Sequence, residues 1–294
     1  MRTVTDNLQG MADAIQSMLQ DLLLNHSSLY RWNDHSGHIV FISLHGDYAY
    51  RKLAEPGRQI QAELLKEYRR FHLICKALLK DQPKDVLEQL SDTDTVVLRT
   101  IEQQQTWCKT LQEALDRALE ALQAQVNLLK SLYDTSAGDT IYVPDTNALL
   151  YNTALETWVF DGVPTFTLIL IPTVLSELDF QKINHRNETV RQKAETLIRQ
   201  IKEYRRRGKL TEGVSLVTGT STVLAVATEP DMRNSLPWLD SNNKDDRFLA
   251  AVIEIMRLRP RSAVIAVSRD INFQNKAEFA SVPFVEPPEP ISVS

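Results

Sequence analysis

Hydrophobic residues in the first half of the chain recur every three to four positions, the spacing of one face of an α-helix. Three helices are predicted there. Their apolar positions are Leu8, Met11, Ile15, Met18 and Leu22, then Ile60, Leu64, Phe71, Cys75 and Leu78, then Cys108, Leu111, Leu115, Ala118, Leu122, Val126 and Leu129. The third is predicted to be unbroken from about Thr93 to Tyr133, and residues 38–53 are predicted to contain a short strand.

The heptad-like spacing of the third helix indicates that it packs against other helices. Its partners are either the earlier helices, in a bundle, or a second copy or other protein. The presence of two earlier helices in the same chain favours the bundle.

After the polar stretch 134–140, apolar runs alternate with helical segments. Strands are predicted at 140–144, 166–171, 214–219, 222–227 and 263–268, and helices at 147–157, 173–183, 188–206 and 243–258. Strands that are apolar throughout suit a mostly parallel central sheet covered by helices on both sides. The predicted organisation is an all-α domain (1–136), a three-layer α/β domain (139–289) and a disordered tail (290–294).

Composition narrows the function only by exclusion. The formal net charge is −5, from 33 Lys+Arg and 38 Asp+Glu, so nucleic-acid binding requires a local basic patch. The two cysteines are predicted to be buried thiols, and the six histidines show no metal-ligand spacing. No phosphate-binding glycine motif, signal peptide or membrane-length apolar run is present, so a cytoplasmic protein without membrane contact is expected.

Acidic residues follow the predicted strands where ligands of open α/β sheets bind, at the carboxyl ends. Asp145 and Asp270 end strands, Glu177 lies on the helix after 166–171, and Asp245 and Asp246 open a helix. Clustered carboxylates repel one another unless a cation neutralises them, and oxygen ligands suit Mg²⁺ or Mn²⁺. Such ions activate water and stabilise the charge that develops on a phosphate.

Each acidic residue also has a structural explanation. Asp145 can cap a helix, and Asp245 and Asp246 suit a helix N-terminus. Glu177 can be a solvated side chain and Asp270 a turn residue. Their convergence on one edge of the predicted sheet favours a site.

Four segments, VPDTNALL, IPTVLSELDFQK, NNKDDRFLAAV and AVIAVSRDINFQNKA, resemble the PIN family, particularly its longer bacterial members, over residues 140–285. By position, the resemblance implies a catalytic metal site and its supporting polar residues. The metal ligands are Asp145, Glu177, Asp245 and Asp270, with Asp246 as a possible auxiliary ligand because the register is uncertain by one; Asn147 and Ser268 support them. The resemblance implies an endoribonuclease that acts on single-stranded or structured RNA.

The helix predicted at 188–206 carries most of the basic residues near this site. Those expected to bind RNA phosphates are Arg199, Lys202, Arg205, Arg206 and Arg207. A solvated helix face explains the same pattern, and His185 is interpreted as a surface-loop residue.

The predicted function is metal-dependent RNA cleavage, with a helical half that regulates or targets it through a protein partner or self-association. Two alternatives stay open. One is a catalytically silent scaffold that binds RNA or protein, and the other is the toxin of a toxin–antitoxin or defence system.

Overall fold

The computed structural model describes residues 3–32, 46–133 and 138–290. The chain divides into two compact units. One is Leu8–Ser131, and the other is Leu132–Ser294 together with Met1–Asn7. The domain limits expected from the sequence stay predictions, and residues 291–294 of the expected tail lie outside the described residues.

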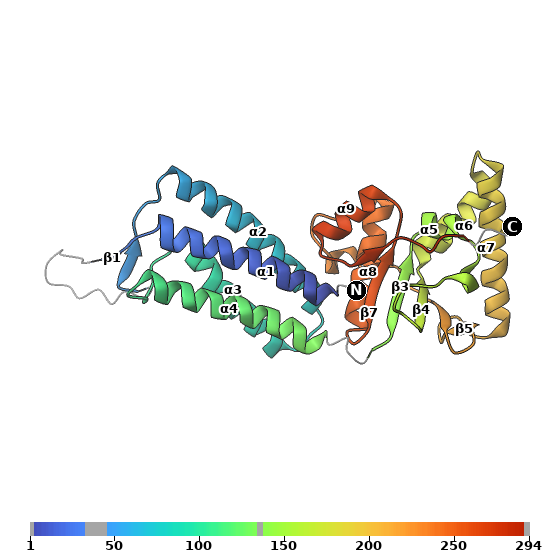
Figure 1. Cartoon of the computed structure of the whole chain (residues 1–294), viewed down its shortest axis with the longest axis horizontal. Coiled ribbons are helices and arrows are strands. Elements are labelled where there is room, and N and C mark those ends of the chain that lie inside the picture. The colour runs from blue at the N-terminus through green and yellow to red at the C-terminus, as the bar shows by residue number, and fades with distance from the viewer. Residues whose placement is uncertain (1–2, 33–45, 134–137, 291–294) are drawn as a thin grey trace. The chain divides into compact units, whose positions relative to one another are not determined.

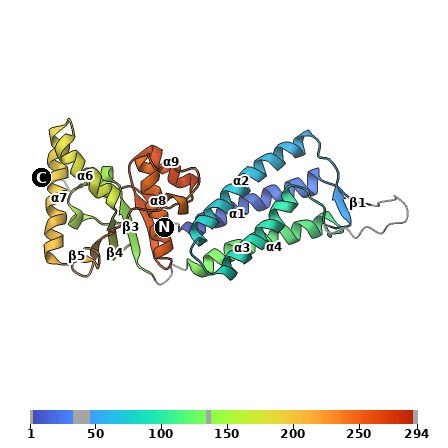
Figure 2. The same ribbon diagram turned by 180° about the vertical axis from the view of Figure 1, so that it is seen from behind.

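The helical unit consists of α-helices that lie side by side (Figures 1 and 2). They are α1 (Val4–Gln20), which continues as the π-helical turn η1 (Asp21–Asn25), α2 (Glu55–Leu79), α3 (Lys84–Ile101) and α4 (Leu111–Leu132). A buried polar chain links three of them, because Gln125 Nε2 donates to Tyr68 Oη at 2.9 Å and Tyr68 Oη donates to Asp94 at 2.9 Å. The helices therefore pack as a bundle within the chain.

The prediction of one unbroken helix from Thr93 to Tyr133 is wrong. α3 begins earlier, after Pro83, and ends at Ile101; Gln103 then takes a positive φ of 55°. α4 begins after Thr110, whose Oγ1 accepts a hydrogen bond from Glu113 N at 3.1 Å. A Thr-x-x-Glu sequence of this kind is a helix-start signal, and it divides the apolar pattern into two helices.

A short hairpin closes one end of the helical unit. Strand β1 (Leu29–Arg31) pairs with β2 (Tyr48–Tyr50), which confirms the strand predicted within 38–53; residues 38–45 lie outside the described residues. Thr106 and Tyr48 exchange two backbone hydrogen bonds, of 3.1 and 2.9 Å. The loop between α3 and α4 is thus fixed to the hairpin.

The second unit is built on a six-stranded sheet of order β5-β6-β4-β3-β7-β8. Its strands are β3 (Thr140–Pro144), β4 (Phe166–Leu170), β5 (Val214–Val217), β6 (Ser221–Ala225), β7 (Ala263–Val267) and β8 (Phe284–Val285). Every neighbouring pair is parallel except β5 and β6, which form a hairpin with Gly219 at φ 75° in its turn. The five predicted strands and the mostly parallel sheet are confirmed.

Helices pack against this sheet to complete the predicted three-layer α/β fold (Figure 1). They are α5 (Thr146–Tyr151), the 3₁₀ turns η2 (Leu155–Thr157) and η3 (Met232–Asn234), α6 (Pro172–Asn184), α7 (Glu188–Arg207), α8 (Lys244–Leu258) and α9 (Ile271–Phe279). The helix predicted at 147–157 is two shorter elements, because Asn152 turns to an extended backbone. α9 and β8 were not predicted. No helix in the described ranges is long and apolar enough to cross a bilayer.

Candidate active site

The sheet topology gathers acidic residues at its carboxyl edge. β3 lies between β4 and β7, and the chain leaves β3 toward β4 but returns to its other side with β7. Open α/β sheets bind ligands at such a reversal. Asp145 directly follows β3, Asp270 follows β7, and Glu177 lies on α6, the helix that follows β4. Three neighbouring strands thus each supply one carboxylate.

Asp145 has both carboxylate oxygens engaged. Its Oδ1 accepts from Ala148 N at 2.6 Å and caps α5, while the fully buried Ser268 donates its hydroxyl to Oδ2. Burial raises the pKa of Asp145 to about 6, with Asp270 and Asp245 adding to the rise and the two hydrogen bonds opposing it. Asp145 therefore caps α5, as its structural explanation predicted. It is also close enough to Asp270 and Asp245 to be repelled by their charges.

Ser268 connects the two acidic residues that follow β3 and β7. Its Oγ donates to Asp145 and accepts from Asp270 N at 3.0 Å. Asp270 Oδ1 in turn accepts from Asn272 N at 2.8 Å at the start of α9. Because Ser268 fixes both segments, its substitution would move two carboxylates at once.

Glu177 is held by two side chains from other elements. Thr146 Oγ1 donates to its Oε2 at 2.7 Å, and Lys244 Nζ approaches its Oε1 to 2.9 Å. The side chain of Glu177 is 22% exposed, whereas that of Lys244 is 60% exposed. The ammonium group therefore partly neutralises Glu177 from the solvent side.

The adjacent Asp245 and Asp246 lie in different environments. Asp246 is 6% exposed and accepts from Lys276 Nζ at 2.6 Å and from Asp240 N at 2.9 Å. Asp245 is half-buried and 3.8 Å from Lys276 Nζ. Burial raises the pKa of Asp245; Lys276 opposes the rise and nearby carboxylates, first Asp270, add to it.

Asp145, Glu177 and Asp245 line one cavity of about 80 Å³. Asn147, an exposed residue of α5, lines it as well. Over the described ranges, no group of three or more His, Cys, Asp or Glu side chains is arranged closely enough to hold a metal ion. The carboxylates are already engaged by hydrogen bonds or lysines, so metal binding would require side chains to reorient.

The profile of the PIN domain matches residues 142–286. That stretch begins within β3 and ends after β8, so it includes every acidic residue described above. Residues 142–286 are a PIN domain. PIN domains are generally nucleases and typically use divalent metals. A comparison with curated proteins finds no match to the chain.

The basic helix of the PIN domain, α7, lies beside β5 at one edge of the sheet. Arg207 donates to the Ser215 carbonyl of β5, and Arg206 pairs with Glu203 at 3.1 Å. The side chains of Arg199, Lys202 and Arg205 are exposed and make no hydrogen bond or ion pair with the described residues. In the sheet, β5 lies three strands away from β3. At about 4.8 Å per strand, the distance between them is about 14 Å.

Sequence reasoning missed the side chains that organise the acidic residues of the PIN domain. Thr146, Lys244 and Lys276 contact Glu177, Asp245 or Asp246 directly. Thr146 and Lys244 each adjoin an acidic residue in the sequence, which was the available signal. Lys276 lies 30 positions from Asp246, and only the fold brings the two together.

Proposed function

We propose that this PIN domain is a divalent-metal-dependent endoribonuclease. The observation that carries the proposal is the convergence of Asp145, Glu177 and Asp245 on one cavity at the carboxyl edge of the sheet. Asp270 contributes a fourth negative charge that raises the pKa of both aspartates. A Mg²⁺ or Mn²⁺ ion would offset this repulsion more strongly than the lysines now do.

In the proposed site, Asp145, Glu177, Asp245 and Asp270 would hold the metal, which would supply Lewis-acid stabilisation of the phosphate and an activated water. The donors are all oxygens, which fits a hard cation. Ser268 orients Asp145, and Thr146 orients Glu177. If Glu177 Oε1 served as a ligand, Lys244 would no longer pair with it, and its ammonium would be available to contact a substrate phosphate.

The contacts of Asp246 support a structural role rather than that of an auxiliary ligand. Both of its oxygens are engaged, Oδ1 by Lys276 and Oδ2 by Asp240 N. We therefore assign Asp245 to the metal and Asp246 to the connection between α8 and α9.

The test of the proposed function is cleavage of a labelled, unstructured RNA by the full chain in Mg²⁺ or Mn²⁺. Products that form with metal and disappear with EDTA support the nuclease. A protein that binds RNA without cutting it in either metal is the scaffold alternative. Growth arrest on expression would favour the toxin alternative only if it requires the same carboxylates.

RNA binding is proposed to use the exposed cations of α7. Changing Arg199, Lys202 and Arg205 to Ala should weaken binding and lower the slope of log affinity against log salt by about 2, since each lost single-strand phosphate contact removes about 0.7. Ala keeps the helix intact. Fluorescence anisotropy in EDTA at several salt concentrations measures the slope.

The matched control changes the same number of exposed cations in the helical unit, Lys66, Lys76 and Lys84, to Ala. Net charge falls equally, but the slope should stay near that of the wild type. If the two triple variants have equal slopes of log affinity against log salt, the cations of α7 form an ordinary solvated helix face and do not bind RNA.

A further inference from the structure

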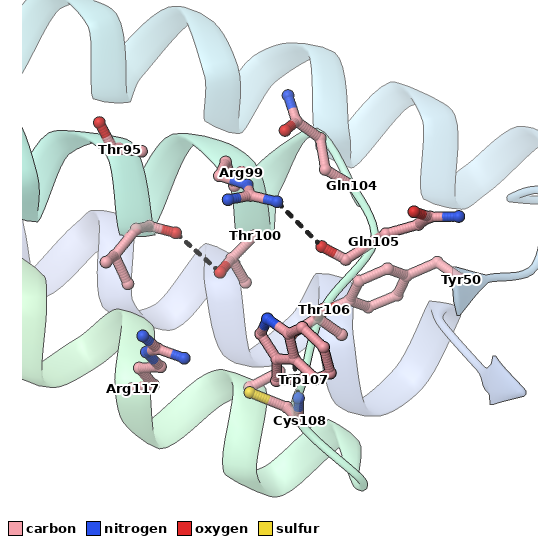
Figure 3. Close-up of a pocket in the computed structure, with 12 residues that line it drawn as sticks. Tyr50, Thr95, Arg99, Thr100, Gln104, Gln105, Thr106, Trp107, Cys108 and Arg117 are labelled. Carbon is pink, nitrogen blue, oxygen red and sulfur yellow. Dashed lines mark hydrogen bonds between the residues drawn. The ribbon is translucent and has the colours of Figure 1, made fainter. Parts of the chain in front are cut away.

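The helical unit contains a cavity of about 120 Å³ that has no part in the proposed nuclease site. The end of α3, the loop that joins α3 to α4 (residues 102–110), the first turns of α4 and Tyr50 of β2 surround it (Figure 3). The loop does not depend on a ligand for its position, because Thr106 is paired with Tyr48 and its Oγ1 accepts from Cys108 N at 3.1 Å. The cavity is therefore preformed.

Two arginines give the cavity a positive charge. Arg99, on α3, is half-buried and donates through Nη2 to the Gln105 carbonyl at 3.3 Å, which leaves further guanidinium hydrogens to donate. Arg117, on α4, is exposed, and its side chain makes no hydrogen bond or ion pair with the residues that the structure describes. The described residues that line the cavity include no Asp or Glu. A lining with two arginines and no carboxylate is suited to an anion.

Trp107 adds a flat aromatic surface at the same cavity. The residue is 53% exposed, an unusual position for an indole, and Figure 3 shows it among the residues that line the cavity, together with Arg99 and Arg117. The paired loop holds its backbone in place. An exposed indole at the same cavity as two guanidinium groups can take a planar ring by stacking, while the guanidinium groups bind an attached anion by hydrogen bonds.

We propose that this cavity is a nucleotide site, in which Arg99 and Arg117 bind the phosphate and Trp107 stacks on the base. A volume of about 120 Å³ accommodates a phosphate group and part of a ribose, so the base lies outside, against the exposed indole. The ligand is either a free mononucleotide or one nucleotide of a single-stranded RNA, because both present the same chemistry. The site is independent of the nuclease proposal, since it shares no residue with it.

The experiment titrates the full chain with AMP, adenosine and a short oligoadenylate, in EDTA so that no RNA is cut. Calorimetry measures affinity, and tryptophan fluorescence reports on the indole. AMP or the oligonucleotide should bind, and adenosine should bind at least tenfold more weakly than AMP. Binding of AMP indicates a free nucleotide as the source, whereas binding of the oligonucleotide alone indicates a strand.

Arg117→Ala should weaken binding of the ligand at least tenfold, while Lys84→Ala, an exposed cation outside the cavity, should leave it unchanged. Trp107→Phe should abolish the fluorescence change and weaken calorimetric affinity; Trp238→Phe, in the PIN unit, should do neither. The proposal is overturned if no ligand binds, or if Arg117→Ala and Trp107→Phe bind as the wild type does. An oligonucleotide affinity that depends only on the α7 cations also overturns it.

Discussion

Replacing Asp145 by Asn is expected to lower the rate of RNA cleavage by at least about two orders of magnitude, because a metal ligand contributes several kcal/mol to transition-state stabilisation. The same substitution should make the metal-free protein more stable at pH 7.5. Asn keeps the oxygen that caps α5 and removes the charge that Asp270 and Asp245 repel. A loss of activity together with a gain in stability identifies a functional residue.

The size and pH dependence of the stability gain follow from the raised pKa of Asp145, about 6 against an ordinary value of 3.8. At about 1.4 kcal/mol per pKa unit, ionising Asp145 in the folded state costs up to about 3 kcal/mol. That cost is present above pH 6, decreases as pH falls from 6 toward 4, and vanishes below 4, where Asp145 is protonated in both states.

Chemical unfolding in EDTA at pH 7.5 and at pH 4 measures this difference. Asp145→Asn should exceed the wild type at the higher pH and match it at the lower. Asp85→Asn, which changes an exposed aspartate in the first turn of α3, is the control and should not show the same gain. If Asp145→Asn is less stable than the wild type at pH 7.5, helix capping outweighs the repulsion.

Substitution of the two neighbouring aspartates of α8 should have opposite consequences. Asp245→Asn should lower cleavage at least about a hundredfold. It should leave stability unchanged or slightly higher, because it removes a half-buried charge that nearby carboxylates repel, and Lys276 Nζ, at 3.8 Å, is beyond hydrogen-bond distance. Asp246→Asn should retain measurable cleavage but lose about 1–3 kcal/mol of unfolding free energy, since it weakens a buried, charge-assisted hydrogen bond to Lys276.

Both variants conserve shape and each removes one charge, so they serve as controls for each other. Initial cleavage rates and unfolding curves separate activity from stability. Wild-type cleavage by Asp245→Asn, or complete inactivity of a folded Asp246→Asn protein, would reverse the assignment of the two residues.

The central strands of the PIN domain could be predicted because β3, β4 and β7 are nearly continuous apolar runs buried on both faces. Their parallel pairing also made it possible to expect Asp145 and Asp270 at one edge. The sequence could not show which of the adjacent residues Asp245 and Asp246 lies at the candidate site. Asp245 and Asp246 are equivalent at a helix N-terminus, and only the folded structure distinguishes them, through burial of Asp246 and its bonds to Lys276 and Asp240 N.

The predictions that failed in the helical unit were those in which apolar periodicity was followed across local signals that end or start a helix. The apolar spacing from Cys108 to Leu129 continues the helical pattern before it, yet the Thr110–Glu113 cap and the positive φ of Gln103 interrupt the chain. The stripe of α1 is likewise displaced, because Ala12 and Leu19 are buried while Met11 and Met18 are half-exposed. The small Ala12 was not counted among the apolar positions. The cavity around Trp107 lies at the break between α3 and α4, so a sequence reading that joined the two helices could not predict it.

The most direct measurement of the proposed metal site is the thermal midpoint of the full chain as Mn²⁺ is added. Metal that binds only the folded protein raises the midpoint by mass action. We expect a rise in the wild type and in Asp246→Asn, and none in Asp145→Asn at the same concentrations. An equal rise in Asp145→Asn and the wild type would contradict the site, because the metal would then bind elsewhere.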